Sequence, residues 1–251
     1  MIIRHSQMAV FGDMAHAQFA AQMADHVREF APELATVAKP EGVREFVHEA
    51  IDAARAQGFR NRECVRLFIE IGLVLGHRFT TDPQYPWIQE VLADEGLVGE
   101  DTRADMLWRY VSDYLDTVVG PERAYVFNAL HRLEEMLGPP QDATLLRGGE
   151  WILDVSRHCY PEKYEYVGQP QLEALLAEAA EAAAGTGLVP GTGPALIGLL
   201  MFCFGHGSLN DPLYPWIKQT LADANPQARL ERLYVKTRAY LRSVSANAPR
   251  H

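Results

Sequence analysis

The chain has 251 residues, of which 48% are hydrophobic and 22% charged, a composition typical of a globular protein. Its formal net charge of −10 argues against broad binding to nucleic acids or anionic membranes, because both need clustered Lys and Arg side chains. The longest apolar run, residues 195–204, is shorter than the about 20 residues that a membrane-spanning helix needs. A basic protein partner would suit such a surface best.

The cysteines and the first residues predict a cytoplasmic protein. Cys64, Cys159 and Cys203 lie far apart, are odd in number and form no Cys-x-x-Cys pair. This pattern favours buried free thiols in a reducing compartment over a disulfide framework. The segment Met1–Ser6 carries no apolar stretch of the kind found in a secretory signal.

Apolar residues spaced by three or four predict helices through the first half of the chain. Asn61 is expected to cap the start of the third helix, and Gly76 to end it. Asp82 and Pro83 are expected to be the N-cap and first residue of a short fourth helix. In chain order, the predicted helices cover about residues 15–30, 40–58, 61–76, 82–94 and 102–118.

The second half gives a matching series. A helical segment over about residues 121–137, stopped by Gly138-Pro139-Pro140, joins the two halves. Helices follow over about residues 151–159, 170–185 and 192–204, the last apolar enough to be buried on nearly all sides. Asp211-Pro212 and Asn225-Pro226 are expected to begin two more. No segment alternates like a strand, so the sequence predicts an all-α fold of ten to twelve helices.

One segment of the chain occurs twice. Residues 76–94 return as residues 205–223 at a constant offset of 129, with 11 of 19 aligned residues identical. Unrelated segments would share about one residue in such a window. Upstream of this segment, identical residues also recur at the offset of 129. Downstream of it, they recur at an offset of 126. The sequence therefore predicts an internal duplication into two tandem five-helix units. Repeat unit 1 covers residues 1–118, a connecting helix residues 119–141, and repeat unit 2 residues 142–251.

The repeated motif has a structural interpretation. Its Asp-Pro pairs are suited to beginning a helix, and a second proline still lies in the first helical turn. Its Tyr and Trp rings supply apolar area that fixes the short helix on its unit. The motif residues are Asp82, Pro83, Tyr85, Pro86 and Trp87 in the first copy and Asp211, Pro212, Tyr214, Pro215 and Trp216 in the second.

A chemical interpretation remains open because the motif also repeats a histidine. His77 and His206, each five residues before an aspartate, would form a shared metal or acid–base site if the copies converge. A metal needs three or four close ligands, so Asp82 and Asp211 would have to join them. A histidine at a helix end can instead interact with the helix dipole.

Other patterns give no catalytic residue. The glycine-rich segment 185–193 lacks the Gly-Lys-Ser/Thr ending of a phosphate loop and is expected to be a flexible connection between helices. Glu45 and His48 form a single Glu-x-x-His pair, which we interpret as a solvated helix face rather than half of a di-iron site. No Gly-x-Ser-x-Gly elbow is present. We expect no cofactor, and an enzyme is less favoured than a binding protein.

Charge is unevenly distributed along the sequence. An acidic group precedes and opens the fifth helix, and the final helix is basic. These are interpreted as solvated faces, or as a bipolar surface suited to protein binding or head-to-tail self-association. The acidic residues are Glu90, Asp94, Glu95, Glu100, Asp101 and Asp105, and the basic ones are Arg229, Arg232, Lys236, Arg238 and Arg242.

Residues 6–94 resemble a family of bacterial helical proteins of unassigned activity, encoded in type VI secretion cassettes beside spike and effector genes. The resemblance implies an accessory role as effector adaptor, chaperone or immunity protein. It identifies no functional residues. The residues that carry it are Gln7, Phe11, Phe19, Pro32, Gly58, Leu75-Gly76, Asp82-Pro83 and Pro86-Trp87.

Together these features predict a non-enzymatic cytoplasmic protein that binds a protein partner, either a secreted effector toxin or a spike component. The alternative is a helical metal-binding protein or enzyme that uses His77, His206, Asp82 and Asp211 at the repeat interface. A structural scaffold or oligomer subunit is a third hypothesis.

Overall fold

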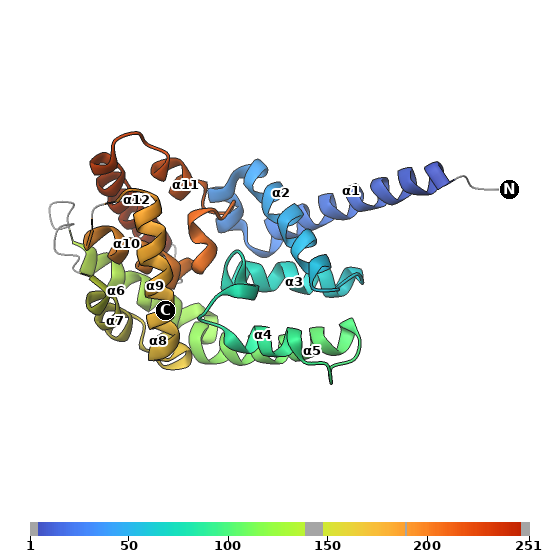
Figure 1. Cartoon of the computed structure of the whole chain (residues 1–251), viewed down its shortest axis with the longest axis horizontal. Helices are drawn as coiled ribbons and strands as arrows, with labels where there is room; N and C mark the ends of the chain where they lie inside the picture. Colours follow the sequence, from blue (N-terminus) through green and yellow to red (C-terminus); the bar gives the residue numbers. More distant parts are fainter. Residues whose placement is uncertain (1–4, 139–147, 189, 247–251) are drawn as a thin grey trace.

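The computed structural model describes residues 5–138, 148–188 and 190–246, and within these ranges the chain is all helical, without a strand (Figure 1). Twelve α-helices occur there, which confirms the predicted fold class. None of these helices is long and apolar enough to cross a membrane.

The first half of the chain supplies helices α1 to α6. Short 3-10 turns precede α4 and α6, and α5 continues as a π-helical turn over Leu115–Val119. The bounds are α1 His5–Phe30, α2 Pro32–Ala56, α3 Arg62–Leu75, α4 Pro86–Ala93, α5 Glu100–Tyr114 and α6 Ala124–Leu137.

The second half supplies helices α7 to α12. Between α10 and α11 lies a 3-10 turn, His206–Leu209. The bounds are α7 Gly148–Cys159, α8 Pro161–Val167, α9 Gln169–Gly185, α10 Thr192–Phe204, α11 Pro215–Leu221 and α12 Pro226–Ala246.

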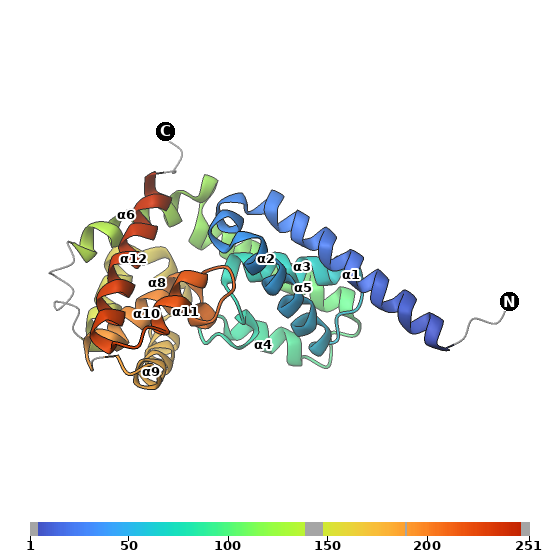
Figure 2. The ribbon, with the colours of Figure 1, turned by 90° about the horizontal axis from the view of Figure 1, so that it is seen from above.

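The helices form two groups along the long axis of the molecule. Helices α1 to α5 lie towards one end and α6 to α12 towards the other, and the N-terminal half of α1 projects from the body in both views (Figures 1 and 2). The apolar helix α10 packs against α9, α7 and α12. Ten of its residues are buried, which confirms that it lies at the centre of the second group.

Several predicted helix ends are confirmed. The Asn61 side chain accepts a hydrogen bond of 3.0 Å from the Glu63 amide at the start of α3, and Gly76 ends that helix. The Asn225 side chain accepts from the Ala228 amide at 3.3 Å in the first turn of α12. The joining helix α6 ends at Leu137 as expected, whereas the predicted Pro139-Pro140 stop lies outside the described residues.

The predicted roles of the Asp-Pro pairs are wrong. Helices α4 and α11 begin at Pro86 and Pro215, so neither Asp82-Pro83 nor Asp211-Pro212 is the N-cap and first residue of a helix. The second proline of each motif instead occupies the first helical turn, where its missing amide costs no hydrogen bond. The aspartates are free for another role because they lie three residues too early.

The prediction that the second helix begins at Pro40 is also incomplete. Helical structure starts at Pro32 and is interrupted at Lys39, whose φ of 61° and ψ of 169° are not helical. At the aligned position of the second half, Gly168 has a φ of 83° and separates α8 from α9. Both halves therefore break this helix at the same place, but only one uses glycine, the residue suited to that conformation.

The strain at Lys39 gives a stability prediction. This backbone region is essentially restricted to glycine and costs other residues about 1–3 kcal/mol, so Lys39→Gly is expected to raise the free energy of unfolding by about 1 kcal/mol in urea titrations. The matched control is Glu45→Gly, at an exposed helical position of the same element, which is expected to lose about 1 kcal/mol. A loss of stability in Lys39→Gly would contradict the strain.

Candidate functional site

The two copies of the repeated motif lie directly against each other. We name residues 76–86 the first motif loop and residues 205–215 the second motif loop. A Cβ atom built on Gly76 would lie 2.2 Å from the Phe204 carbonyl oxygen, and one on Gly205 would lie 2.8 Å from the Leu75 oxygen. Both glycines also have φ near +90°, at 101° and 89°. The loops cross at these glycines because no side chain fits between their backbones.

The aspartates of the motif exchange hydrogen bonds across this crossing. Asp82 Oδ2 accepts from the His206 amide at 2.8 Å, and Asp211 Oδ2 accepts from the His77 amide at 3.4 Å. Each other carboxylate oxygen accepts from its own loop, from the Gln84 amide at 2.9 Å and the Leu213 amide at 2.8 Å. The two aspartates are only 3% and 1% exposed. They bind the opposite loop, which is why they do not cap their own helices.

The histidine rings bind glutamates rather than each other. His77 Nε2 lies 2.8 Å from an oxygen of Glu49 on α2, and His206 Nδ1 lies 3.0 Å from an oxygen of Glu178 on α9. The other nitrogen of His206 lies 3.0 Å from the Arg78 carbonyl oxygen. The structure thus brings both histidines to the crossing, but each ring is engaged separately.

The arrangement does not favour the proposed two-fold metal site. Across the part of the chain that the structure describes, no group of three or more His, Cys, Asp and Glu side chains is placed to hold a metal ion. The carboxylates of Asp82 and Asp211 are occupied by backbone amides, and the rings of His77 and His206 by glutamates and carbonyls.

Burial changes the protonation of these groups. It raises the pKa of Asp211 to about 7, against the effect of its two backbone hydrogen bonds, and nearby Glu49 raises it further. Burial and the charges of Arg78 and His206 lower the pKa of His77 to about 4. At neutral pH the His77 ring is therefore uncharged. Burial also raises the pKa of Asp82, but the charge of His206 and the amide hydrogen bonds oppose this shift.

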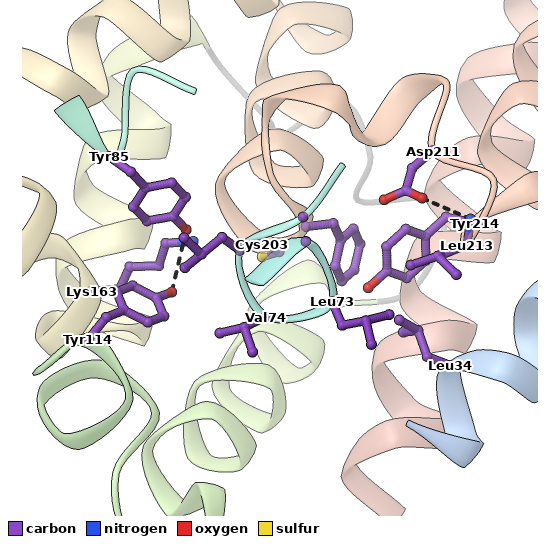
Figure 3. A pocket seen from close by; sticks show the side chains of 14 residues that line it. Leu34, Leu73, Val74, Tyr85, Tyr114, Lys163, Cys203, Asp211, Leu213 and Tyr214 are labelled. Carbon is purple, nitrogen blue, oxygen red and sulfur yellow. Dashed lines mark hydrogen bonds between the residues drawn. The ribbon is translucent and has the colours of Figure 1, made fainter. Parts of the chain in front are cut away.

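A cavity of about 50 Å³ lies beside the crossing, between the two motif loops (Figure 3). Tyr85, Tyr114 and Lys163 line one side of it, and Asp211 and Tyr214 the other. A water molecule needs about 10–15 Å³ of such space, so this cavity suits a few water molecules and not a substrate.

The tyrosines around the cavity repeat the same arrangement. Tyr85 and Tyr114 meet edge to face with ring centres 5.5 Å apart, and their hydroxyl oxygens are 3.4 Å apart. Tyr214 and Tyr240 meet edge to face at 5.7 Å. One pair fixes the first motif loop to α5, and the other fixes the second motif loop to α12. The predicted packing role of the motif tyrosines agrees with these contacts.

Two polar residues beside the cavity were missed by the sequence analysis. Lys163 is 3% exposed, donates a hydrogen bond to the Phe202 carbonyl oxygen, and lies over the rings of Tyr85 and Phe202. Gln84 donates to both oxygens of Asp82 and to the Met201 carbonyl oxygen. The repeat aligns them with two leucines, Leu34 and Leu213. This departure from the repeat is the signal that could have identified them.

The three cysteines have the properties expected of structural thiols. All three are free, with Cys64 and Cys159 buried and Cys203 partly buried. Burial raises the pKa of Cys64 and Cys203 to about 12 and that of Cys159 to about 11. Since the thiolate is the reactive form, these cysteines are poor nucleophiles.

The predicted bipolar surface is weakened by internal ion pairs. Arg238 and Arg242 of α12 both pair with Glu134 of α6, at 3.4 Å and 2.9 Å, and Arg232 pairs with Asp223. On the acidic side, Glu100 accepts a hydrogen bond of 2.8 Å from the Asn61 amide. The final helix therefore uses most of its basic residues to bind the rest of the chain.

The Glu-x-x-His pair behaves as expected, and the glycine-rich segment lies at a connection between helices. Glu45 and His48 are both exposed on α2, as predicted for a solvated face. Segment 185–193 connects α9 to α10, with residue 189 outside the described ranges.

The glycine crossing gives a second stability prediction. Gly76→Ala should destabilise the protein both through its positive φ, by about 1–3 kcal/mol, and through the clash with the Phe204 carbonyl, by about 1–3 kcal/mol more. Gly99 is the control, because its φ is +92° but nothing lies within 4 Å of an added Cβ. Chemical unfolding should show a clearly larger loss for Gly76→Ala than for Gly99→Ala. Equal losses would contradict the close approach.

The buried ionisable groups predict opposing pH effects. Asp211 titrates at about 7 when folded against an ordinary 3.8, so the folded state holds more protons there and stability falls as pH rises from about 4 to 7. His77 titrates at about 4 against an ordinary 6.5, so stability rises with pH over about 4 to 6.5. The two effects offset each other in the native chain.

Single variants should separate these effects in urea unfolding measured from pH 4.5 to 7.5. His77→Gln removes the rise in stability that His77 causes. The stability of this variant should therefore fall with pH across this range more steeply than that of the native chain. Asp211→Asn keeps an oxygen that can accept from the Leu213 amide, but it cannot titrate. The fall in stability caused by Asp211 is then absent, so the stability of this variant should rise with pH up to about 6.5. Parallel pH profiles for both variants and the native chain would refute the assignment.

Comparison with protein-family models, curated protein sequences and solved structures gave no match to this chain.

Proposed function

We propose that this chain is a non-enzymatic, cytoplasmic accessory protein that binds a secreted bacterial effector toxin. The observation that carries the proposal is an exposed aromatic surface on α5. We define the α5 surface as the exposed face of this helix, with Trp108 and Tyr110, two residues apart, on its opposite flanks and Asp105 between them. Trp108 is 49% exposed and Tyr110 is 38% exposed. Tryptophan and tyrosine are enriched among the residues that contribute most to protein–protein binding.

The fold holds the Tyr110 side of the α5 surface in place. The Tyr110 ring stacks on Trp87 of α4, with ring centres 5.2 Å apart and planes 15° apart. On the inner face of the same helix, Tyr114 contacts Tyr85 of the first motif loop. An anchor that is already ordered loses little conformational entropy when a partner binds, and this supports a role in recognition.

The charge near this surface favours a basic partner. Asp105 lies three residues before Trp108 and so on a neighbouring part of the helix surface. Among the described residues, Glu90, Glu95 and Asp105 form no ion pair within the chain. Together with the net charge of −10, these carboxylates are available to attract Lys and Arg side chains.

The chemistry at the loop crossing also supports a binding role. The aspartates and the His206 ring are engaged in contacts between the halves, the His77 ring binds Glu49 of its own half, and the adjacent cavity of about 50 Å³ is too small for a substrate. Immunity proteins, adaptors and chaperones need only a complementary surface. The resemblance of residues 6–94 to type VI secretion accessory proteins points the same way.

We also infer that the chain is a duplicated five-helix unit, with units at residues 1–118 and 142–251 joined by residues 119–141. The reciprocal contacts between aligned residues support this inference, as does the shared break at Lys39 and Gly168. With this break, α8 and α9 together correspond to α2, so each unit has five corresponding elements.

The binding role is tested with the product of the neighbouring gene. Tagged native chain should co-purify with that product, and Trp108→Ala should weaken the complex by about tenfold or more, as expected for a central aromatic contact. The control is Phe30→Ala, because Phe30 is 51% exposed but lies at the end of α1. It should bind as the native chain does.

Deleting the gene separates the possible roles. An immunity protein is required for survival beside the toxin, whereas an adaptor or chaperone is required for toxin secretion. If the native chain does not bind the product, and its deletion changes neither toxicity nor secretion, the proposal is wrong.

A further inference from the structure

Three arginines converge on a groove between α1, α2 and the start of α3. We name this feature the arginine groove; it has a volume of about 200 Å³. It lies on the first half of the chain, and no residue of the motif loops or of the α5 surface lines it. Its principal lining residues are His16, Phe19, Ile51, Arg55, Arg60 and Arg62.

The groove combines an apolar floor with a cationic rim. Phe19, Ile51 and Val65 are buried beneath it. Arg55, Arg60 and Arg62 are exposed at its edge. This combination would suit a ligand that carries both a negative charge and an apolar part.

Two of the arginines are held in place by neutral groups. The Arg62 guanidinium lies 5.3 Å from the centre of the Phe19 ring. Arg55 Nη2 donates a hydrogen bond of 2.9 Å to His16 Nδ1. With Nδ1 as acceptor, the neutral His16 ring carries its proton on Nε2 and can donate from there. The contacts orient the cations without neutralising them.

Within residues 14–138, 151–188, 190–225 and 228–245, no carboxylate pairs with the arginines of the groove, although the chain carries a net charge of −10. Elsewhere in the structure, arginines pair with acidic side chains, as Arg44 does with Glu41 on α2 at 3.1 Å. The Glu100 carboxylate accepts a hydrogen bond from the Arg60 backbone amide and does not pair with the Arg60 guanidinium. Three guanidinium groups therefore line one groove without a carboxylate partner among the side chains of those residues.

We propose that the arginine groove binds a phosphate monoester with a small aromatic or apolar substituent. A guanidinium forms two parallel hydrogen bonds to a phosphate, and a dianionic phosphate has three terminal oxygens to share among three arginines. The substituent would lie against Phe19, Ile51 and Val65. The groove is large enough for such a group, which would contact the apolar atoms that remain exposed at its base, whereas an inorganic ion would contact only the arginines.

The test is calorimetric titration of the full chain with phenyl phosphate and, separately, with inorganic phosphate. Phenyl phosphate should bind with an affinity that falls as salt is added, and inorganic phosphate should bind at least about tenfold more weakly, a difference of about 1.4 kcal/mol. Equal affinities would overturn the proposal, because they would mean that the floor contributes nothing. Undetectable binding of phenyl phosphate at millimolar concentration would overturn it as well.

Variants place the binding in the groove. Arg60→Met and Arg62→Met should each weaken phenyl phosphate binding by about tenfold or more, since each removes a charged hydrogen-bonding partner. Arg44→Met is the matched control, an exposed arginine of α2 outside the groove, and should leave the affinity unchanged. Circular dichroism melting checks that each variant folds. If all three variants bind phenyl phosphate as the native chain does, the assignment is wrong.

Discussion

The reciprocal hydrogen bonds of Asp82 and Asp211 are the constraint on which the rest of the structure depends. Each buried carboxylate accepts from the backbone amide of the histidine in the opposite loop, and the two glycines between them let the backbones touch. A buried carboxylate without such partners would cost several kcal/mol, so the two halves are strongly held in one relative position. This contact also explains why each short helix begins three residues later than its Asp-Pro pair suggests.

The crossing determines where function can lie. Its two aspartates bind the opposite loops, its histidine rings bind glutamates, and the adjacent cavity is only large enough for water. The tyrosine contacts transmit the order of the crossing outward, from Tyr85 through Tyr114 to α5, where Trp108 and Tyr110 are exposed. A rigid centre with recognition residues on outer helices is an arrangement suited to binding, and the arginine groove lies on another part of the same half.

The two halves are not interchangeable at the crossing. On one side Lys163 and Gln84 place polar groups around Asp82, whereas Leu34 and Leu213 occupy the aligned positions near Asp211. Lys163 and Gln84 find hydrogen-bond partners on their side of the crossing, and Leu34 and Leu213 need none on theirs. An amide or ammonium group buried among leucines would lack such partners. The nearby cation also opposes the effect of burial on Asp82, whereas Asp211 has a pKa of about 7. Pairing the wrong halves would bring polar and apolar groups together, which favours the single observed arrangement.

The sequence by itself determined the helical class, most helix positions, the repeated motif and caps such as Asn61, because these depend on local spacing and on hydrogen bonds between near neighbours. It also identified the buried helix α10 from its uniform apolar character. Only the tertiary structure decided what Asp82, Asp211 and the two histidines bind, because the amides that bind the aspartates across the crossing lie more than 100 residues away and the glutamates that bind the histidine rings lie on other helices. The same holds for the arginine groove, whose cations come from separate elements and share no sequence pattern. Local sequence patterns predicted that each aspartate caps the nearest helix. In the folded chain, backbone amides from the opposite motif loop bind the same carboxylate oxygens instead.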